Sequence, residues 1–313
     1  MADVAVRPPI IEVERPRRWR RQGRLPGEPR AIGWVYVLPA FAIYAAFNIV
    51  PLIQGINLSF YNWDGISQGT WAGLANYKDF FTDPVIRASY LHTVVLIVFY
   101  SFIPTAIGLF LAALLSRMRI RGLTVFRMLL FLPTVLTDVV LAIAWTNIYD
   151  PQGALNNFLR AVGLGGLARP WLGDYHWALP AVGVFGAWED YGFCMILFLA
   201  GVMKIPQSLY EAARVDGANA FREFFTVTLP GLRFELTVVV VLTMIDALGT
   251  FDEVFIMTQG GPGTATTVPA FQVYSRAFLE GRVGSAAAMG ITLMLIVFAV
   301  SYGITKVLEP SDR

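Results

Sequence analysis

Six long apolar segments constrain what this 313-residue chain can fold into. Each holds enough residues to cross about 30 Å of hydrocarbon at about 1.5 Å per residue of α-helix. The composition agrees, because 56% of the residues are hydrophobic, only 15% are charged and the mean hydropathy is +0.58. We therefore predict an all-α integral membrane fold. Its six transmembrane helices are expected at about 32–55, 89–115, 125–148, 177–203, 235–257 and 286–307.

The distribution of Lys and Arg predicts the orientation of these helices. With the N-terminus inside, 18 of the 24 basic residues fall on the cytoplasmic side and six fall outside, which is the bias that membrane proteins show. We therefore expect both termini, and the polar segment 204–233, in the cytoplasm. The chain is predicted to be a multi-pass membrane protein.

Three regions follow from the same pattern. Residues 1–31 carry eight arginines and no periodic apolar pattern, which predicts a disordered basic leader that touches anionic headgroups. Residues 32–307 form the transmembrane domain. Residues 308–313 are predicted to be a cytoplasmic tail.

This chain lacks the residue patterns that several classes of chemistry require. None of the three lysines, Lys78, Lys204 and Lys306, follows a glycine, so the chain has no G-x-x-x-x-G-K-[ST] loop for ATP. The single cysteine lies inside an apolar segment, and the two histidines are far apart. We expect no catalytic residue, no metal site and no cofactor bound by this chain, which is therefore not predicted to be an enzyme.

The polar stretch 204–231, between the fourth and fifth apolar segments, carries helix signals. Glu211 and Arg214 are predicted to form an i,i+3 pair, Gly217 permits a left-handed turn, and a second short helix is expected over 221–228. A helix resting on lipid headgroups is disfavoured, because such helices are usually richer in Lys and Arg. Residues at helical spacing in the first helix are Leu209, Ala212, Ala213 and Asp216.

This stretch resembles the EAA loop of permease subunits in binding-protein-dependent ABC importers. The fuller form found in the sugar branch, I-P-x-x-L-Y-E-A-A-x-x-D-G-A, is matched over 205–218. Two other elements are similar to the same branch: R-x-x-x-F-L-P at 127–133 and F-D-x-V-F-I-M-T-Q-G-G-P at 251–262. The resemblance covers roughly 35–307, and its one small departure is Val227, where the family more often has Ile. The residues that match the EAA motif are Glu211, Ala212, Ala213, Asp216, Gly217, Leu229 and Pro230.

The resemblance implies a six-helix permease fold of the maltose and oligosaccharide family, whose EAA segment is a cytoplasmic coupling helix that docks into an ATPase. It places the chain in the cytoplasmic membrane of a prokaryote, and it further implies three kinds of partner in addition to the lipid bilayer: a second homologous permease subunit, two ATPase subunits that hold ATP and Mg, and an extracytoplasmic solute-binding protein. No nucleic acid is expected. The solute implied is a sugar, namely a di- or oligosaccharide.

Carboxylates occur near the middle of three apolar segments, at Asp138, at the pair Glu189 and Asp190, and at Asp246. A lone charge at that depth costs at least about 2.5–3.5 kcal/mol, and no Lys or Arg lies at that depth to pair with it. These acids are therefore either protonated or line an aqueous cavity, although hydrogen bonds that only brace the helices remain an alternative. With the aromatic rings nearby, which suit the faces of a sugar, the predicted substrate pathway consists of Glu189, Asp190, Trp188, Tyr191, Asp246, Asp138 and Trp145.

The outer end of the fifth segment is predicted to have irregular backbone, because glycines follow one another there. Asp252 matches the family's F-D element, and contact with the substrate is as compatible with this match as a gate or a brace for the loop. The residues assigned to this outer gate or loop are Asp252, Gly260, Gly261 and Pro262.

Two other functions stay open from the sequence. The acids could select a polyamine or another cationic solute within the same importer class. They could instead relay protons in a proton-coupled secondary transporter, which would transport without an ATPase.

Overall fold

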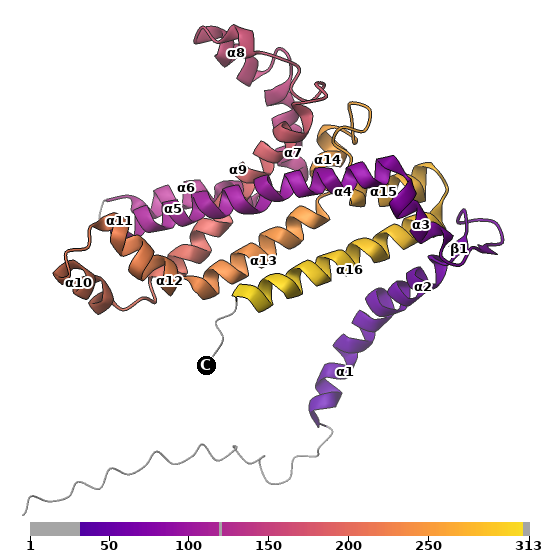
Figure 1. Cartoon of the computed structure of the whole chain (residues 1–313), viewed down its shortest axis with the longest axis horizontal. Helices are drawn as coiled ribbons and strands as arrows, with labels where there is room; N and C mark the ends of the chain where they lie inside the picture. Colours follow the sequence, from indigo (N-terminus) through magenta and orange to yellow (C-terminus); the bar gives the residue numbers. More distant parts are fainter. Residues whose placement is uncertain (1–31, 119–120, 309–313) are drawn as a thin grey trace, which may run out of the picture. The chain divides into compact units, whose positions relative to one another are not determined.

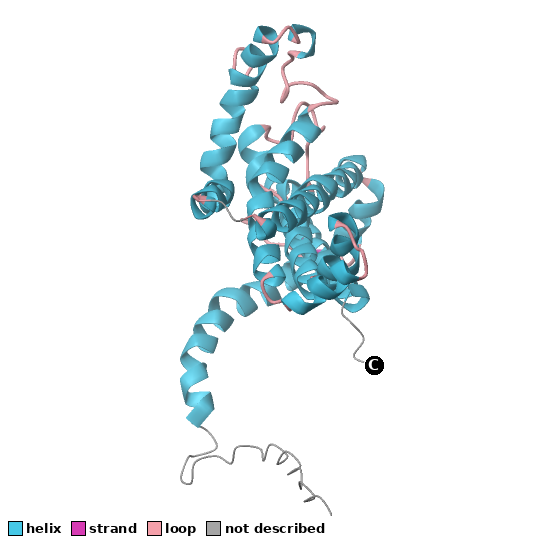
Figure 2. Ribbon diagram, turned by 90° about the vertical axis from the view of Figure 1, so that its left-hand side faces the viewer, coloured by secondary structure: helices cyan, strands magenta, loops and turns pink. Residues whose placement is uncertain are grey.

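The computed structural model describes residues 32–118 and 121–308. Helices make up nearly all of the regular structure in this part of the chain, as Figure 2 shows. The predicted leader 1–31, and the predicted tail after residue 308, lie outside the described residues. Five of the described helices are long and apolar enough to cross a membrane, and a bent pair of helices makes a sixth. This confirms the predicted all-α membrane fold.

The first of two compact units ends at Ile53 and carries the first span. The helix over Trp34–Leu58 has the length and apolarity of a membrane span. Pro51 cannot donate the backbone hydrogen bond expected of its position, and a wider turn precedes it. The elements are α1 (Ile32–Tyr44), the π-helical turn η1 (Ala45–Ile49) and α2 (Val50–Leu58), which continues into the second unit.

The second unit, from Gln54 onward, contains a continuous span over Pro84–Arg117. The Asp83 carboxylate caps its start by accepting the backbone N–H of Val85 at 2.8 Å, and Pro84 suits the first turn. A π-helical turn precedes Pro104, whose missing N–H cannot continue the regular bonding pattern. The parts of the span are α4 (Pro84–Ile97), η2 (Val98–Phe102) and α5 (Ile103–Arg117).

The most buried span is α9 (Ala178–Val202), which packs against α5 and against α6 (Leu123–Val135). Glycines let the neighbouring helices approach it closely, as small residues do in membrane proteins. A Cβ at Gly186 would lie 2.2 Å from Tyr100 Cζ, and one at Gly192 would lie 2.7 Å from the Leu130 carbonyl oxygen. Both hydrophobic cores of this unit include α9 side chains, Phe185 in one and Phe198 in the other.

The last two spans lie beside each other, and the fifth also lies beside the α4–α5 span, in Figure 1. The fifth span, Arg233–Met257, is interrupted at Thr250 and Phe251, whereas the sixth is one helix. These elements are α13 (Arg233–Gly249), α14 (Asp252–Met257) and α16 (Val283–Leu308).

The single helix predicted over 125–148 needs correction, because the structure breaks it at Leu136. Helices α6 and α7 (Asp138–Tyr149) meet at a bend of 95°, and α7 leaves α6 steeply in Figure 1. Pro133 lies in the last turn of α6, and Leu136 then adopts an extended backbone with ψ of 154°. Asp138 consequently lies in the first turn of α7 and not in the middle of a straight helix.

The segments predicted to lie outside the membrane also contain short elements, including a two-residue antiparallel strand pair that the all-α prediction did not include. Arg276 is buried there and pairs with Asp79 and Asp83, so it ties the segment after the fifth span to the start of the second. The elements are β1 (Tyr61–Asn62), β2 (Thr70–Trp71), α3 (Ala75–Thr82), α8 (Ala154–Ala161), the 3-10 turn η3 (Gly165–Leu167), α15 (Pro269–Tyr274) and the π-helical turn η5 (Ser275–Leu279).

The close approach of Tyr100 to Gly186 generates a stability prediction. Gly186→Ala forces a methyl group into the Tyr100 ring, and such overpacking costs about 1–3 kcal/mol. Gly290→Ala, in α16, is the control, because a Cβ there meets nothing within 4 Å and Ala favours a helix over Gly by about 1 kcal/mol. In thermal unfolding of the detergent-solubilised protein, we expect a lower midpoint for Gly186→Ala than for Gly290→Ala. Equal midpoints for the two variants would contradict the packing described.

Candidate functional site

The predicted coupling segment forms a short helix, α10 (Gln207–Val215), with a well-defined end. Asp216 is its C-cap, and Gly217 follows in the left-handed region with φ of +77°. The Gly217 N–H donates to the Arg214 carbonyl at 3.0 Å, and the Ala218 N–H donates to the Ala213 carbonyl at 2.9 Å. This pair of bonds is the Schellman motif, which requires a residue that tolerates positive φ. Gly217 therefore sets where the helix ends.

None of the residues of α10 is buried within the described chain. Leu209 is 51% exposed and Val215 is 87% exposed. Glu211 and Ala212 are also exposed, whereas Ala213 is partly covered. The side chains at helical spacing thus form an uncovered surface at the cytoplasmic side predicted from the charges.

The second predicted helix, 221–228, is a turn of α-helix followed by a π-helical turn. Asn219 caps it by accepting the Arg222 backbone N–H at 2.9 Å. Leu229 and Pro230 open a last short turn that leads into α13. The elements are α11 (Ala220–Glu223), η4 (Phe224–Thr228) and α12 (Leu229–Gly231).

Glu223 joins three elements through its carboxylate, which is 3% exposed. Arg214 Nε, on α10, donates to Oε1 at 2.7 Å, and Arg117 Nη2, at the end of α5, lies 2.9 Å from Oε2. We call Arg117, Glu223 and Arg214 the Glu223 bridge. The predicted pair of Glu211 with Arg214 is therefore corrected, since the Arg214 guanidinium turns toward α11.

The bridge changes the proton affinity of its members. The hydrogen bond from Arg214 lowers the pKa of Glu223, and the charge of Arg117 adds to this effect against the opposing influence of burial. The same hydrogen bond to Glu223 raises the pKa of Arg214. At neutral pH Glu223 and Arg214 are therefore both ionised.

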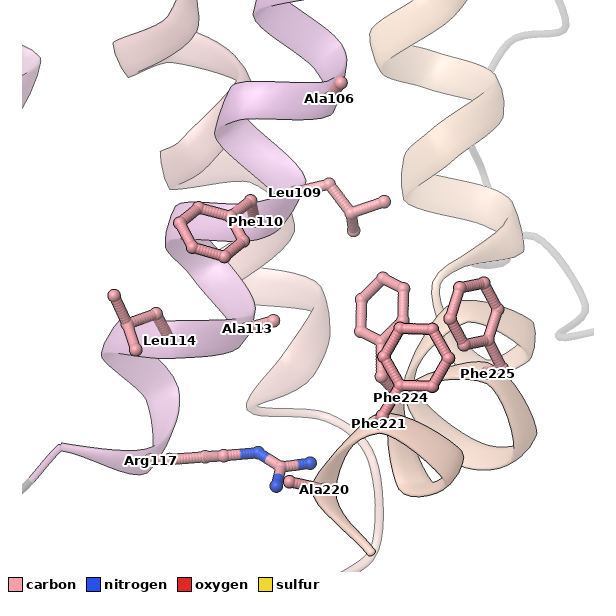
Figure 3. A pocket seen from close by; sticks show the side chains of 10 residues that line it. All are labelled: Ala106, Leu109, Phe110, Ala113, Leu114, Arg117, Ala220, Phe221, Phe224 and Phe225. Carbon is pink, nitrogen blue, oxygen red and sulfur yellow. The ribbon is translucent and has the colours of Figure 1, made fainter.

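An apolar pocket of about 510 Å³ lies between α5 and the segment Ala220–Phe225. Figure 3 shows α5 side chains on one wall, three phenylalanine rings on the opposite wall, and the Arg117 side chain at one end. The phenylalanines are Phe221, Phe224 and Phe225.

The predicted pathway carboxylates come from three helices, and the structure brings them near one another. Glu189 is 8% exposed and interacts electrostatically with Asp138, and Asp190 interacts with Asp246. The Thr134 hydroxyl, just before the α6–α7 break, donates to the Glu189 carbonyl at 2.9 Å. No salt bridge neutralises any of these four acids in residues 32–118 and 121–308.

Burial divides these acids into two pairs. Glu189 is buried and Asp190 is half-buried in α9, whereas Asp138 and Asp246 are exposed on α7 and α13. Asp246 is the fourteenth residue of the 25-residue span Arg233–Met257, so an exposed carboxylate lies at its middle.

The predicted pathway aromatics mostly pack on each other. The rings of Trp145 and Trp188 lie 5.2 Å apart, and Trp145 also contacts the Phe185 ring edge-on at 5.9 Å. Tyr191, one residue after Asp190, is half-buried. The two tryptophans thus form an aromatic wall next to Glu189.

Two residues of this region were not predicted from the sequence. Glu253, in the first turn of α14, is 7% exposed and interacts electrostatically with Asp246 and Asp138. Tyr100 lies in the π-helical turn η2 with a buried hydroxyl that has no hydrogen-bond partner in the described chain. Pro104, four residues later, was the available signal for irregular backbone there. We call Asp138, Glu189, Asp190, Asp246 and Glu253 the carboxylate cluster.

The predicted outer loop is irregular, as its glycines require. Gly260 has φ of +81°, and a Cβ there would lie 2.8 Å from the Phe271 ring. The Thr266 hydroxyl donates to the Gly261 carbonyl at 2.8 Å, and Pro262 follows in the same turn. Asp252 is exposed in the first turn of α14. Gly260 thus packs against α15.

Comparison with known proteins identifies the class to which this architecture belongs. Residues 104–312 match the family described as "Binding-protein-dependent transport system inner membrane component". The chain belongs to this family. It is 35% identical to the probable ABC transporter permease protein YurN of Bacillus subtilis, over 87% of this chain and 94% of that protein. It is 30% identical to the lactose transport system permease protein LacF of Rhizobium radiobacter, over 86% of this chain and 91% of that protein.

The fold of this permease also matches a solved structure. A bacterial ABC transporter involved in the import of the acidic polysaccharide alginate has a chain that aligns with a TM-score of 0.77 at 21% identity, covering 90% of this chain and 96% of that one. The resemblance to ABC importer permeases is thus confirmed. As a member of this family, the chain is an inner membrane transport component and not an enzyme.

The lowered pKa of Glu223 generates a pH prediction. A carboxylate with a depressed folded pKa contributes stability above its ordinary pKa of 4.5, and the contribution is lost as the pH falls through the folded pKa. We expect wild type to unfold a few degrees above Glu223→Gln at pH 7, since each 1 kcal/mol corresponds to about 2–4 °C. The gap should close below pH 4.5. A gap that persists unchanged in acid would show that the Glu223 charge does not stabilise the permease.

Proposed function

We propose that this permease is the transmembrane subunit of an ATP-driven importer that carries a neutral di- or oligosaccharide, and that α10 docks on a separate ATPase subunit. The observation that carries the proposal is the uncovered α10 helix, whose motif residues Glu211–Gly217 end in a Schellman turn. A short helix with no buried residue gains stability from a partner surface. The chain has no phosphate-binding loop of its own, so the nucleotide belongs to the partner.

The exposed acids support a second permease subunit. Asp246 lies at the middle of a span, where a carboxylate facing lipid costs at least about 2.5–3.5 kcal/mol. A homologous subunit placed against α13 and α7 would enclose Asp246 and Asp138 in a shared aqueous pathway. The exposed acids then face solute and water instead of hydrocarbon.

The proposed solute follows from the chemistry of the pathway and from the relatives. Carboxyl groups accept hydrogen bonds from sugar hydroxyls, and the Trp145–Trp188 wall offers flat apolar faces to sugar rings. One relative is named for lactose, and the aligned solved structure is named for alginate, an acidic polysaccharide. A cluster of five carboxylates without paired cations repels an anion, so we favour a neutral sugar over an acidic one.

In the proposed cycle, a solute-binding protein delivers sugar at the outer side, and ATP closes the two ATPase subunits at the inner side. Closure displaces α10, which both permeases present to the ATPases. The helices rock between inward-facing and outward-facing arrangements, and hydrolysis resets them. Specificity is shared between the binding protein and the two permeases.

One observation favours a second candidate solute. The unpaired carboxylate cluster suits a polyamine or another cationic solute in the same importer class. Aromatic faces such as this wall also suit cations, so the wall does not distinguish a neutral sugar from a cationic solute.

The docking role of α10 is tested by Glu211→Ala. A carboxylate at an interface hot spot contributes about 2 kcal/mol, or about 30-fold in affinity. We expect the ATPase retained on a tagged wild-type permease to be lost from this variant at comparable membrane insertion. Ser208→Ala, an exposed change on the same helix outside the motif, should retain it. Equal retention by both variants would contradict docking through Glu211.

Competition for uptake distinguishes a neutral sugar from a cationic solute. Cells that depend on the complex for uptake of a labelled disaccharide are challenged with an excess of unlabelled maltose or lactose, or of spermidine. A neutral-sugar importer loses uptake with the sugars and keeps it with spermidine. Inhibition by spermidine alone would favour the cationic solute.

A further inference from the structure

Helix α10 moves with α11 and η4, because its contacts are mainly with them. The Tyr210 hydroxyl on α10 lies 3.1 Å from the Thr228 hydroxyl on η4. Arg214, in the last turn of α10, bonds the Glu223 carboxylate of α11 at 2.7 Å. A displacement of α10 therefore carries α11 with it.

An ion pair links α10, α11 and η4 to the α4–α5 span. Apart from Arg117 and Ala220 at one end, the two sides of the interface are separated by the apolar pocket in Figure 3. A gap lined by carbon transmits little force, because dispersion contacts fall off steeply with separation. The Arg117–Glu223 ion pair, at 2.9 Å with the Glu223 side chain buried, closes this gap directly. Separating Arg117 from the buried Glu223 Oε2 removes an electrostatic attraction, which opposes separation.

Arg117 is the last residue of the 34-residue helical span Pro84–Arg117. The same span carries Tyr100, whose ring packs on Gly186 of α9, one turn before Glu189. A movement passed to Arg117 thus reaches the wall of the carboxylate cluster through one continuous helix and one tight contact.

We propose that Glu223 is a positioning residue that transmits the movement of α10 to the α4–α5 span, and through that span to the carboxylate cluster. This inference rests on the proposed docking role of α10. Glu223 lies outside the matched EAA motif residues, and its partner Arg117 lies about 100 residues earlier in the chain. A bridge that served only folding would lower stability when broken but would leave ATP-driven movement unchanged.

The test uses the complex purified through a tag on this chain, with the ATPase that co-purifies. Spin labels replace Met118, beside the end of α5, and Val215, at the end of α10, with Cys194 changed to Ser. Distances are measured without nucleotide and after trapping with ATP and vanadate. In the wild-type background we expect the distance distribution to have the same mean and width with and without trapping, because the ends of α5 and α10 move together. In Glu223→Gln, trapping should shift and broaden the distribution.

A second readout follows the pathway itself. A cysteine replacing Tyr191 is treated with a membrane-impermeant maleimide in both nucleotide states. We expect its reactivity to change on trapping when the bridge is intact and to lose this change in Glu223→Gln, while ATP hydrolysis continues. The response of the pathway residue is then lost although ATP hydrolysis continues. Loss of stability alone would not produce this result.

Two further variants keep the test decisive. Arg117→Gln removes only the α5 side and leaves Arg214 paired with Glu223, so it should lose the trapping response even if Glu223→Gln folds poorly. Glu235→Gln breaks the Lys204–Glu235 pair, which is also 2.9 Å long at the same membrane side, and should keep the response. A wild-type response in Arg117→Gln overturns the inference.

The proposed docking role can fail separately. If no ATPase co-purifies with the wild-type permease, docking of α10 is contradicted. The width of the distance distribution between the two spin labels, measured in the permease alone, then still shows whether the Glu223 bridge holds α10 to α5. A narrow distance distribution in wild type and a broad one in Glu223→Gln supports the positioning role of Glu223. Equal widths overturn that role.

Discussion

Inside hydrocarbon a chain must satisfy its own backbone hydrogen bonds, and this constraint explains where the permease is regular and where it is not. The spans are helices, and irregular backbone is tolerated only against protein or water. The two breaks within spans, at Leu136–Thr137 and at Thr250–Phe251, are each followed by acids. Asp138 follows the first break, and Asp252 and Glu253 follow the second. The breaks and the acids together indicate a polar interior.

One helical span contacts both the Glu223 bridge and the wall of the carboxylate cluster. The span Pro84–Arg117 contributes Tyr100 beside the cluster and Arg117 to the bridge. Glycines of α9 bring this span close enough that movement of one helix displaces the other. The exposed helix α10 and the carboxylate cluster thus belong to one connected structure.

Much of this could be predicted from the sequence, because the relevant signals are local. Apolar segment length indicates spans, and Gly217 with its preceding residues indicates where α10 ends. The break at Leu136 was missed because apolar composition continues through it, although Pro133 marks the place. The Arg117–Glu223 pair and the burial of Glu253 and Tyr100 depend on which helices become neighbours. That information is not contained in any one stretch of the sequence.

We propose that this permease transports solute only when a separate ATPase drives it through α10. The most direct test is uptake of labelled maltose or lactose into liposomes that contain the purified chain alone, with and without an imposed proton gradient. The account predicts no uptake above protein-free liposomes in either condition. Sustained uptake by the chain alone, driven by the proton gradient, would contradict it and support a proton-coupled carrier.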